Sequence, residues 1–176
     1  MSDIQIPNGR KLPVCVEWVY THACFKKTLE VLSSAIVALT VLTFIGGGIY
    51  LALSSWISAL LYVITLFVPF VLVSILRVWI DAARPCAVYT LQNVELPHKK
   101  TSRSMPSRHV FSVFAIGASI CFFHLPLGLT TLVFGIVLAA CRVLLAVHFM
   151  RDVAVGACIG ALSGIISGIV IINCLF

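Results

Sequence analysis

The feature that most constrains this sequence is a long stretch without a charged side chain, which runs from Val31 to Leu76. A helix needs about 20 predominantly apolar residues to cross the hydrocarbon core of a membrane. The stretch has room for two such helices, which we expect at residues 31–53 and 56–76, with a short turn at Ser54 and Ser55. The sequence therefore predicts a chain embedded in a membrane.

The composition of the whole chain points the same way. Of its 176 residues, 61% are hydrophobic and 10% are charged, and the mean hydropathy is +1.12. A soluble domain carries about 25% charged residues, so a soluble globular domain is excluded, as are a disordered tail and a fibrous repeat. The formal net charge is +6. In a membrane chain this excess predicts anionic membrane lipids or a phosphate substrate as partners, and no nucleic acid.

Three further spans are expected beyond the first two. The third starts near Arg108 and ends at 125–126, the fourth covers 127–147, and the fifth covers 153–176. Segment 12–25 is apolar but too short to cross. Its aromatic residues, followed by two lysines, indicate a helix lying in the membrane interface, with a loosely held tail as the alternative.

The expected fold class is therefore all-α: a polytopic membrane helix bundle of about five transmembrane helices plus a short N-terminal interfacial helix. We expect two regions, a polar tail with the interfacial helix at residues 1–27 and a membrane-embedded domain at residues 28–176. The seven cysteines show neither metal-ligand spacing nor a disulfide framework.

Five spans place the N-terminal arm, the loop at 81–107 and the turn at 147–152 on one face of the membrane. All 12 lysines and arginines fall on this face or at helix ends that point to it. We expect the cytoplasmic membrane as the location, and the positive-inside rule would then place that face on its cytoplasmic side.

Three groups of polar residues on this face are candidates for chemistry, because charges within or at the ends of spans are costly. The first group is Arg77, Asp81 and Arg84, which follows the second span. The spacing would put the three side chains on one side of a continuing helix. The alternative is an ion-paired helix end without a further role.

The second group, Pro106-Ser107-Arg108-His109, opens the third span. A serine before a helix is typical of an N-cap, and the helix N-terminus that follows favours an anion. His109 would lie in the first turn, within reach of that anion. The alternative is a plain cap with an interfacial histidine.

The third group is Arg142, His148 and Asp152. His148 and Asp152 are four residues apart, so a helical turn would set the carboxylate beside the imidazole and leave the other ring nitrogen free as a nucleophile. The alternative is a salt bridge at a helix end.

Taken together, the three groups indicate phosphoryl transfer. The planar fork of arginine suits phosphate oxygens, and two histidines suit a nucleophile and a leaving-group acid. The carboxylates are too few for a two-metal phosphatase. The predicted chemistry is metal-free and runs through a phosphohistidine, so we expect no metal and no cofactor.

At this point the sequence resembles a known family. Three motifs are similar, in order, to the signatures of the type 2 phosphatidic acid phosphatase and vanadium haloperoxidase superfamily: Arg77-x6-Arg84-Pro85, Pro106-Ser107-Arg108-His109 and Cys141-Arg142-x5-His148-x3-Asp152. The resemblance covers residues 30–176. It implies a helical membrane enzyme that removes phosphate from lipid phosphates or pyrophosphates without metal.

The resemblance also implies roles for individual residues. His148 would be the nucleophile, Asp152 would orient it, and His109 would protonate the leaving group. The phosphate-binding residues would be Arg77, Arg84, Ser107 and Arg142, together with the backbone at Arg108.

The chain departs from the family pattern at four points. Arg77 replaces the usual lysine and keeps its charge, whereas Cys141 replaces a serine and removes a hydroxyl. Arg108 replaces a glycine, and its long side chain would either crowd the site or add a phosphate contact. Members commonly have six spans, and many act on the outer side of the membrane, opposite to the side that the charges favour.

Three other functions compete with a lipid phosphatase. A vanadate-dependent haloperoxidase-like enzyme uses a similar pocket, although its known relatives are mostly soluble. A transport protein would line an anion path with its arginines, which leaves the spacing of His148 and Asp152 unexplained. A catalytically inactive lipid-binding relative is the third, favoured by Arg108.

Phosphatidate, phosphatidylglycerol phosphate and polyprenyl pyrophosphate all present a phosphate on an apolar anchor. The sequence neither chooses among them nor indicates an oligomeric state.

Overall fold

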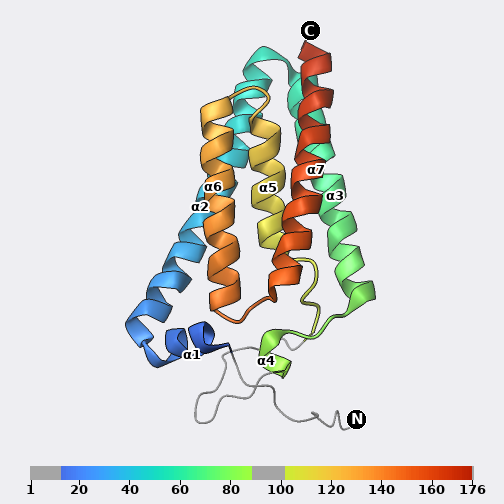
Figure 1. Ribbon diagram of the computed structural model, residues 1–176. Helices are drawn as coiled ribbons and strands as arrows, with labels where there is room; N and C mark the ends of the chain where they lie inside the picture. Colours follow the sequence, from blue (N-terminus) through green and yellow to red (C-terminus); the bar gives the residue numbers. More distant parts are fainter. Residues whose placement is uncertain (1–12, 89–101, 176) are drawn as a thin grey trace.

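The computed structural model describes residues 13–88 and 102–175, and within these ranges the regular structure is entirely helical (Figure 1). The elements in chain order are α1 (Val14–Thr21), α2 (Ala23–Ser54), α3 (Trp56–Ile80), α4 (Pro85–Val88), α5 (Arg108–Ile120), α6 (Leu125–Leu144) and α7 (Met150–Leu175). This confirms the predicted all-α bundle.

In the described part of the chain, α2, α3, α6 and α7 are each long and apolar enough to cross a membrane. The third predicted span corresponds to α5, which is apolar but has only 13 residues and ends before the expected 125–126. The cause lies in the next helix. Pro126 cannot donate within a helix but suits the first turn of α6, where His124 Nδ1 accepts a bond from the N–H of Leu127. The chain therefore turns between Ile120 and Leu125.

Helix α1 lies across the end of the bundle at which the site described below is found (Figure 1). It is shorter than the expected helix at 12–25, because α1 ends at Thr21. A new helix, α2, starts after His22 and contains Lys26 and Lys27. The expected region boundary after residue 27 falls inside α2. Tyr20 Oη donates to the carbonyl oxygen of Leu145 at 2.9 Å, and burial raises the pKa of Tyr20 to about 12, so the hydroxyl remains a donor at neutral pH.

Helix α5 is the centre of the bundle and packs most extensively against α7. Four glycines on α7, each four residues from the next, form the contact: Gly156, Gly160, Gly164 and Gly168. A Cβ on Gly160 would lie 2.4 Å from the carbonyl oxygen of Phe111, and one on Gly156 would lie 2.7 Å from that of Ser107. Only small residues let two helix backbones approach this closely.

The apolar core is built around α5 by residues of α2, α3 and α7. Its members are Leu51, Tyr62, Leu66, Val73, Phe111, Ala115, Ile116, Ile120 and Ile171. Because α5 is held between this core and the glycines of α7, the start of α5 is fixed beside the start of α7.

Candidate active site

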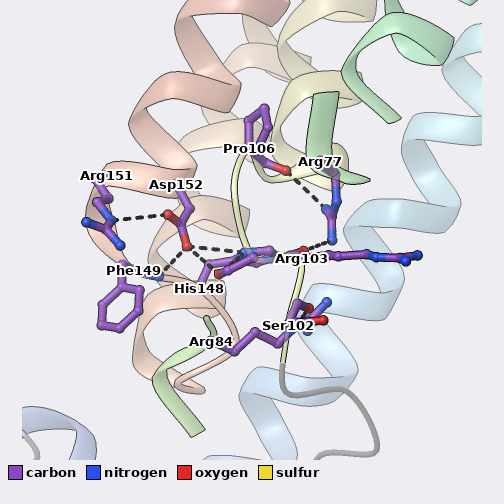
Figure 2. A network of polar contacts seen from close by, with 10 residues as sticks. Arg77, Arg84, Ser102, Arg103, Pro106, His148, Phe149, Arg151 and Asp152 are labelled. Carbon is purple, nitrogen blue, oxygen red and sulfur yellow. Dashed lines mark hydrogen bonds and ion pairs between the residues drawn. The ribbon is translucent and has the colours of Figure 1, made fainter. Parts of the chain in front are cut away.

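The three motifs lie at one end of the bundle, where α3 and α6 end and α5 and α7 begin (Figure 1). Figure 2 shows residues from each of them there: Arg77 and Arg84, Pro106, and His148 and Asp152. Arg77 lies in the last turn of α3, and Arg142 lies in the last turn of α6. Ser107 immediately precedes α5, and Asp152 lies in the first turn of α7. The structure thus brings side chains from four separate segments to one place.

The prediction that Arg77, Asp81 and Arg84 lie on one side of a helix was wrong. Helix α3 ends at Ile80, and Asp81 adopts a left-handed conformation with φ of 39°, from which its N–H donates to the carbonyl oxygen of Arg77 at 3.2 Å. Pro85 disfavours helical geometry at Arg84, so a helix could not have continued through Arg84 in any case. Asp81 pairs with Arg103, with 3.7 Å between Oδ1 and Nε, and is not bracketed by Arg77 and Arg84.

Both arginines of the first motif hold the residues that lead into α5, which we call the 102–106 segment. Arg77 is buried and donates to the carbonyl oxygens of Arg103 and, at 3.1 Å, of Pro106. Arg84 donates from Nε to the carbonyl oxygen of Ser102 at 3.2 Å. A guanidinium has five N–H donors, so each arginine retains donors for an anion while it fixes the segment.

Ser107 takes the N-cap position that the sequence predicts, but its hydroxyl does not cap the helix. The N–H of Ser107 donates to the backbone oxygen of Asp152 at 3.0 Å, which ties the second motif to the third. Ser107 Oγ and Arg142 Nε are both buried and have no hydrogen-bond partner among the described residues. An unpaired buried polar atom costs about 1–3 kcal/mol, so these two atoms are poised for a ligand.

His148 and Asp152 are both buried, with 3.8 Å between Nδ1 and Oδ2. The prediction of a helical turn that joins the two residues was wrong, because α7 starts only at Met150 and His148 lies in the loop before it. The carboxylate is instead oriented by the N–H of Phe149, which donates to Oδ2 at 3.1 Å, and by Arg151, whose Nε lies 3.6 Å from Oδ1.

Burial lowers the pKa of His148 below its ordinary value, and the charges of Arg84 and Arg77 act in the same direction. The negative charge of Asp152 opposes this shift without cancelling it. The imidazole is therefore neutral near pH 7, which is the form in which a ring nitrogen has a lone pair to donate.

Sequence reasoning missed Ser104. This serine is fully buried, and its Oγ donates to Asp152 Oδ2 while lying 3.3 Å from His148 Nδ1. In the sequence it is only a serine two residues before Pro106, and nothing in that position distinguishes it from its neighbours Ser102 and Ser107.

His109 and Arg108 are exposed at the start of α5, where they line one end of an apolar cavity of about 330 Å³. A second cavity of about 240 Å³ shares four of its lining residues, which are Phe44, Phe70, Ser112 and Ile116. We call the two together the apolar groove; it runs between α2, α3 and α5. His109 lies near enough to Arg142, His148 and Arg77 for their charges to act on it, so the end of the groove at Arg108 and His109 lies beside the polar cluster.

Cys141, which stands where the family has serine, lies away from this polar cluster. It is buried with Val19, Leu29 and Leu145, and so serves the packing of α1 and α2 on α6. Among the residues that the structure describes, no three His, Cys, Asp or Glu side chains are grouped as a metal ion would require.

Comparison with known proteins identifies the family. A family model described as the PAP2 superfamily matches residues 56–173. The bacitracin transport permease protein BcrC of Bacillus licheniformis is 38% identical over 77 residues, which make up 43% of this chain and 38% of that protein. The chain thus matches well under half the length of this curated relative.

Two solved structures have similar folds. LpxE of Aquifex aeolicus superposes with a TM-score of 0.66 at 22% identity, over 86% of this chain and 91% of LpxE. A transmembrane PAP2-type phosphatidylglycerolphosphate phosphatase from Bacillus subtilis gives a TM-score of 0.64 at 21% identity, over 87% of this chain and 80% of the phosphatase. At these identities the likeness concerns the fold.

Proposed function

Because the chain belongs to the PAP2 superfamily and is an integral membrane protein, we propose that it is a lipid phosphatase of the cell membrane. It removes phosphate from a lipid phosphate or pyrophosphate through a phosphohistidine intermediate and needs no metal. His148, Asp152 and His109 carry out the chemistry, and Arg77, Arg84, Ser107, Arg142 and the backbone at Arg108 bind the phosphate.

One observation carries this proposal: Ser107 Oγ and Arg142 Nε are buried donors without a partner in the described part of the chain, in the same cluster as the neutral His148. A phosphate group satisfies both donors at once. The N-terminus of α5 adds backbone N–H groups and the positive end of a helix dipole. A simple ion-paired helix end would leave neither donor unpaired.

The reaction follows from the positions of the two histidines. The free ring nitrogen of His148 attacks phosphorus, and the bond between phosphorus and the leaving oxygen breaks while His109 gives that oxygen a proton. Water then attacks the phosphohistidine, His109 accepts a proton from this water, and inorganic phosphate leaves. The arginines stabilise the charge on the phosphoryl oxygens in both steps.

The apolar groove supports a lipid as the substrate. It starts at Arg108 and His109 and is otherwise lined mainly by aliphatic and aromatic side chains of three membrane helices. A substrate with its phosphate at the charged end has its apolar chain in the groove. Phosphatidate, phosphatidylglycerol phosphate and polyprenyl pyrophosphate all meet this description, and the Bacillus subtilis protein of similar fold is a phosphatase for the second of them.

The first test concerns metals and anions. The purified protein in detergent is expected to release inorganic phosphate from lipid phosphates in excess EDTA, because the site has arginines where a metal enzyme has carboxylates. Vanadate should inhibit it competitively, since this anion adopts the trigonal-bipyramidal geometry of phosphoryl transfer. Activity lost in EDTA and restored by Mg²⁺ would contradict the metal-free mechanism. Bromide oxidation by the vanadate-loaded protein with peroxide, without phosphate release, would favour the haloperoxidase.

The second test concerns Arg108, which stands where the family has glycine. Its side chain is exposed at the mouth of the groove, and only its backbone is assigned to the phosphate. Arg108→Gly is therefore expected to keep phosphate release within about tenfold of the wild type, or about 1.4 kcal/mol in the barrier. A thousandfold loss would make the guanidinium part of the phosphate site. The same variant tests whether the chain is an inactive relative. In that case the wild type would bind lipid phosphate without hydrolysing it, and Arg108→Gly would be active.

A further inference from the structure

The carboxylate of Asp152 does not contact the imidazole of His148 directly. The distance of 3.8 Å between Oδ2 and Nδ1 is beyond that of a hydrogen bond. Ser104 Oγ contacts both atoms: it is hydrogen-bonded to Oδ2 and lies 3.3 Å from Nδ1. The group within hydrogen-bond distance of Nδ1 is therefore a hydroxyl, and it links the imidazole to the carboxylate beside it.

The donors and acceptors in this chain of contacts have one consistent arrangement. An ionised carboxylate only accepts, so the O–H of Ser104 donates to Asp152 Oδ2. The hydroxyl proton is then used, and Oγ faces Nδ1 with its lone pairs. Nδ1 must carry the hydrogen and donate it to Oγ, which leaves the lone pair of the neutral ring on Nε2.

We propose that Ser104 is a positioning residue which transmits the effect of Asp152 to His148, fixing the tautomer that leaves Nε2 free for attack. The inference rests on the proposed function and deepens it. When the bond between Nε2 and phosphorus forms and the bond to the leaving oxygen breaks, the ring becomes cationic. The hydrogen bond from Nδ1 to Oγ strengthens at that moment, and the carboxylate of Asp152, which lies 3.8 Å from Nδ1 and accepts from the hydroxyl, stabilises the cation. Attack of water breaks the bond to phosphorus and returns its electron pair to Nε2, while the Nδ1 hydrogen stays in place throughout.

The hydroxyl is held from several directions. The N–H of Ser104 donates to the carbonyl oxygen of Ala82 at 2.9 Å, and Arg77 binds the carbonyl oxygens of Arg103 and Pro106 on either side of it. Arg84 binds the carbonyl oxygen of Ser102. The same two arginines that face the phosphate thus also fix the position of the serine. A side chain placed only to fill space would need no such support.

The test compares three variants for phosphate release. Ser104→Ala is expected to lower kcat about 100-fold with KM within about threefold, because the phosphate-binding groups are untouched while the ring loses its orientation. Ser104→Thr keeps the hydroxyl and should recover most of the activity. Ser74→Ala is the matched control, since the Ser74 hydroxyl bonds only to the carbonyl oxygen of Phe70 in its own helix, and this variant should match the wild type.

Two further measurements separate a relay from a structural contribution. Asp152→Asn should cost much less in the Ser104→Ala background than in the wild type, because both changes break the same chain of contacts. The acidic limb of the kcat/KM profile should move to lower pH in Ser104→Ala, because the protonated imidazole loses the acceptor of its Nδ1 hydrogen. If Ser104→Ala does not fold, Ser104→Cys fills the same space with a weak donor and must show the same loss.

The relay is overturned if Ser104→Ala, or Ser104→Cys in its place, keeps the wild-type kcat. It is also overturned if the losses of Ser104→Ala and Asp152→Asn simply add. These results are distinct from failure of the proposed function, in which the wild type and the Ser74→Ala control themselves release no phosphate.

Discussion

Replacing His148 by alanine will abolish the release of phosphate from lipid phosphates, by at least about a thousandfold or about 4 kcal/mol in the barrier. No other group at the site has both the position and the free lone pair for attack on phosphorus. His109 is close enough to interact with His148, but it is assigned to the leaving oxygen, and it has no carboxylate behind it among the described residues. Ser107 and Arg142, which we propose as phosphate-binding residues, are unchanged, so binding of the anion should survive the change.

The measurement is trapping of a covalent phosphoenzyme with labelled lipid phosphate, quenched in alkali, where phosphohistidine is stable. The wild type should give a labelled band that acid removes, and His148→Ala should give none while keeping the thermal unfolding profile of the wild type. His109→Ala is the companion variant, and it should still become labelled with substrates that have good leaving groups. A labelled His148→Ala protein would refute the assignment of the nucleophile.

The second large effect, on stability and on phosphate release, is expected from the addition of a single methyl group in Gly160→Ala. The added Cβ would lie 2.4 Å from the backbone oxygen of Phe111, and a backbone atom cannot move aside as the tip of a side chain can. Overpacking of this kind costs about 1–3 kcal/mol, or about 2–4 °C in the unfolding midpoint for each kcal/mol in a chain of this size. Helices α5 and α7 must separate, which also moves Ser107 away from Asp152, so phosphate release should fall at least about tenfold.

Gly46→Ala is the matched control, because a Cβ at Gly46 has no neighbouring atom within 4 Å. Both variants make the same chemical change in a membrane helix, and only the contact with a second helix differs. Thermal unfolding in detergent and the rate of phosphate release are measured for each. If the two variants behaved alike, the close approach of α5 and α7 would not be what holds the site together.

The sequence was informative where the physics is local to a segment. Absence of charge over Val31 to Leu76 is enough to require two membrane helices, and hydropathy alone located the others to within a few residues, as α6 and α7 illustrate. The motif residues also stand out in the sequence, because histidine, arginine and aspartate are costly in a membrane, and the structure places them at one end of the bundle. Local patterns do not encode how helix ends meet. The end of α3 at Asp81 and the position of His148 before α7 depend on packing between helices.

Ser104 illustrates the same limit at the level of one hydroxyl. Its partners, Asp152 and His148, are more than forty residues away in the sequence, and it reaches them only because Arg77 and Arg84 hold the 102–106 segment. A serine in a polar loop carries no sign of this in its neighbours. The apolar groove was equally hidden, since its walls come from three helices whose apolar residues read individually as lipid-facing surface.

The shortness of α5 has a consequence for the surrounding bilayer. Thirteen residues of helix extend about 20 Å, whereas the hydrocarbon core is about 30 Å thick. The bundle therefore has one short member at its centre, and α5 begins deeper in the bundle than the ends of α3 and α6 beside it (Figure 1). A helix shorter than the hydrocarbon core favours local thinning of the bilayer around it. Bilayer thickness then becomes a determinant of turnover: thin, fluid membranes should deliver substrate more readily than thick, ordered ones.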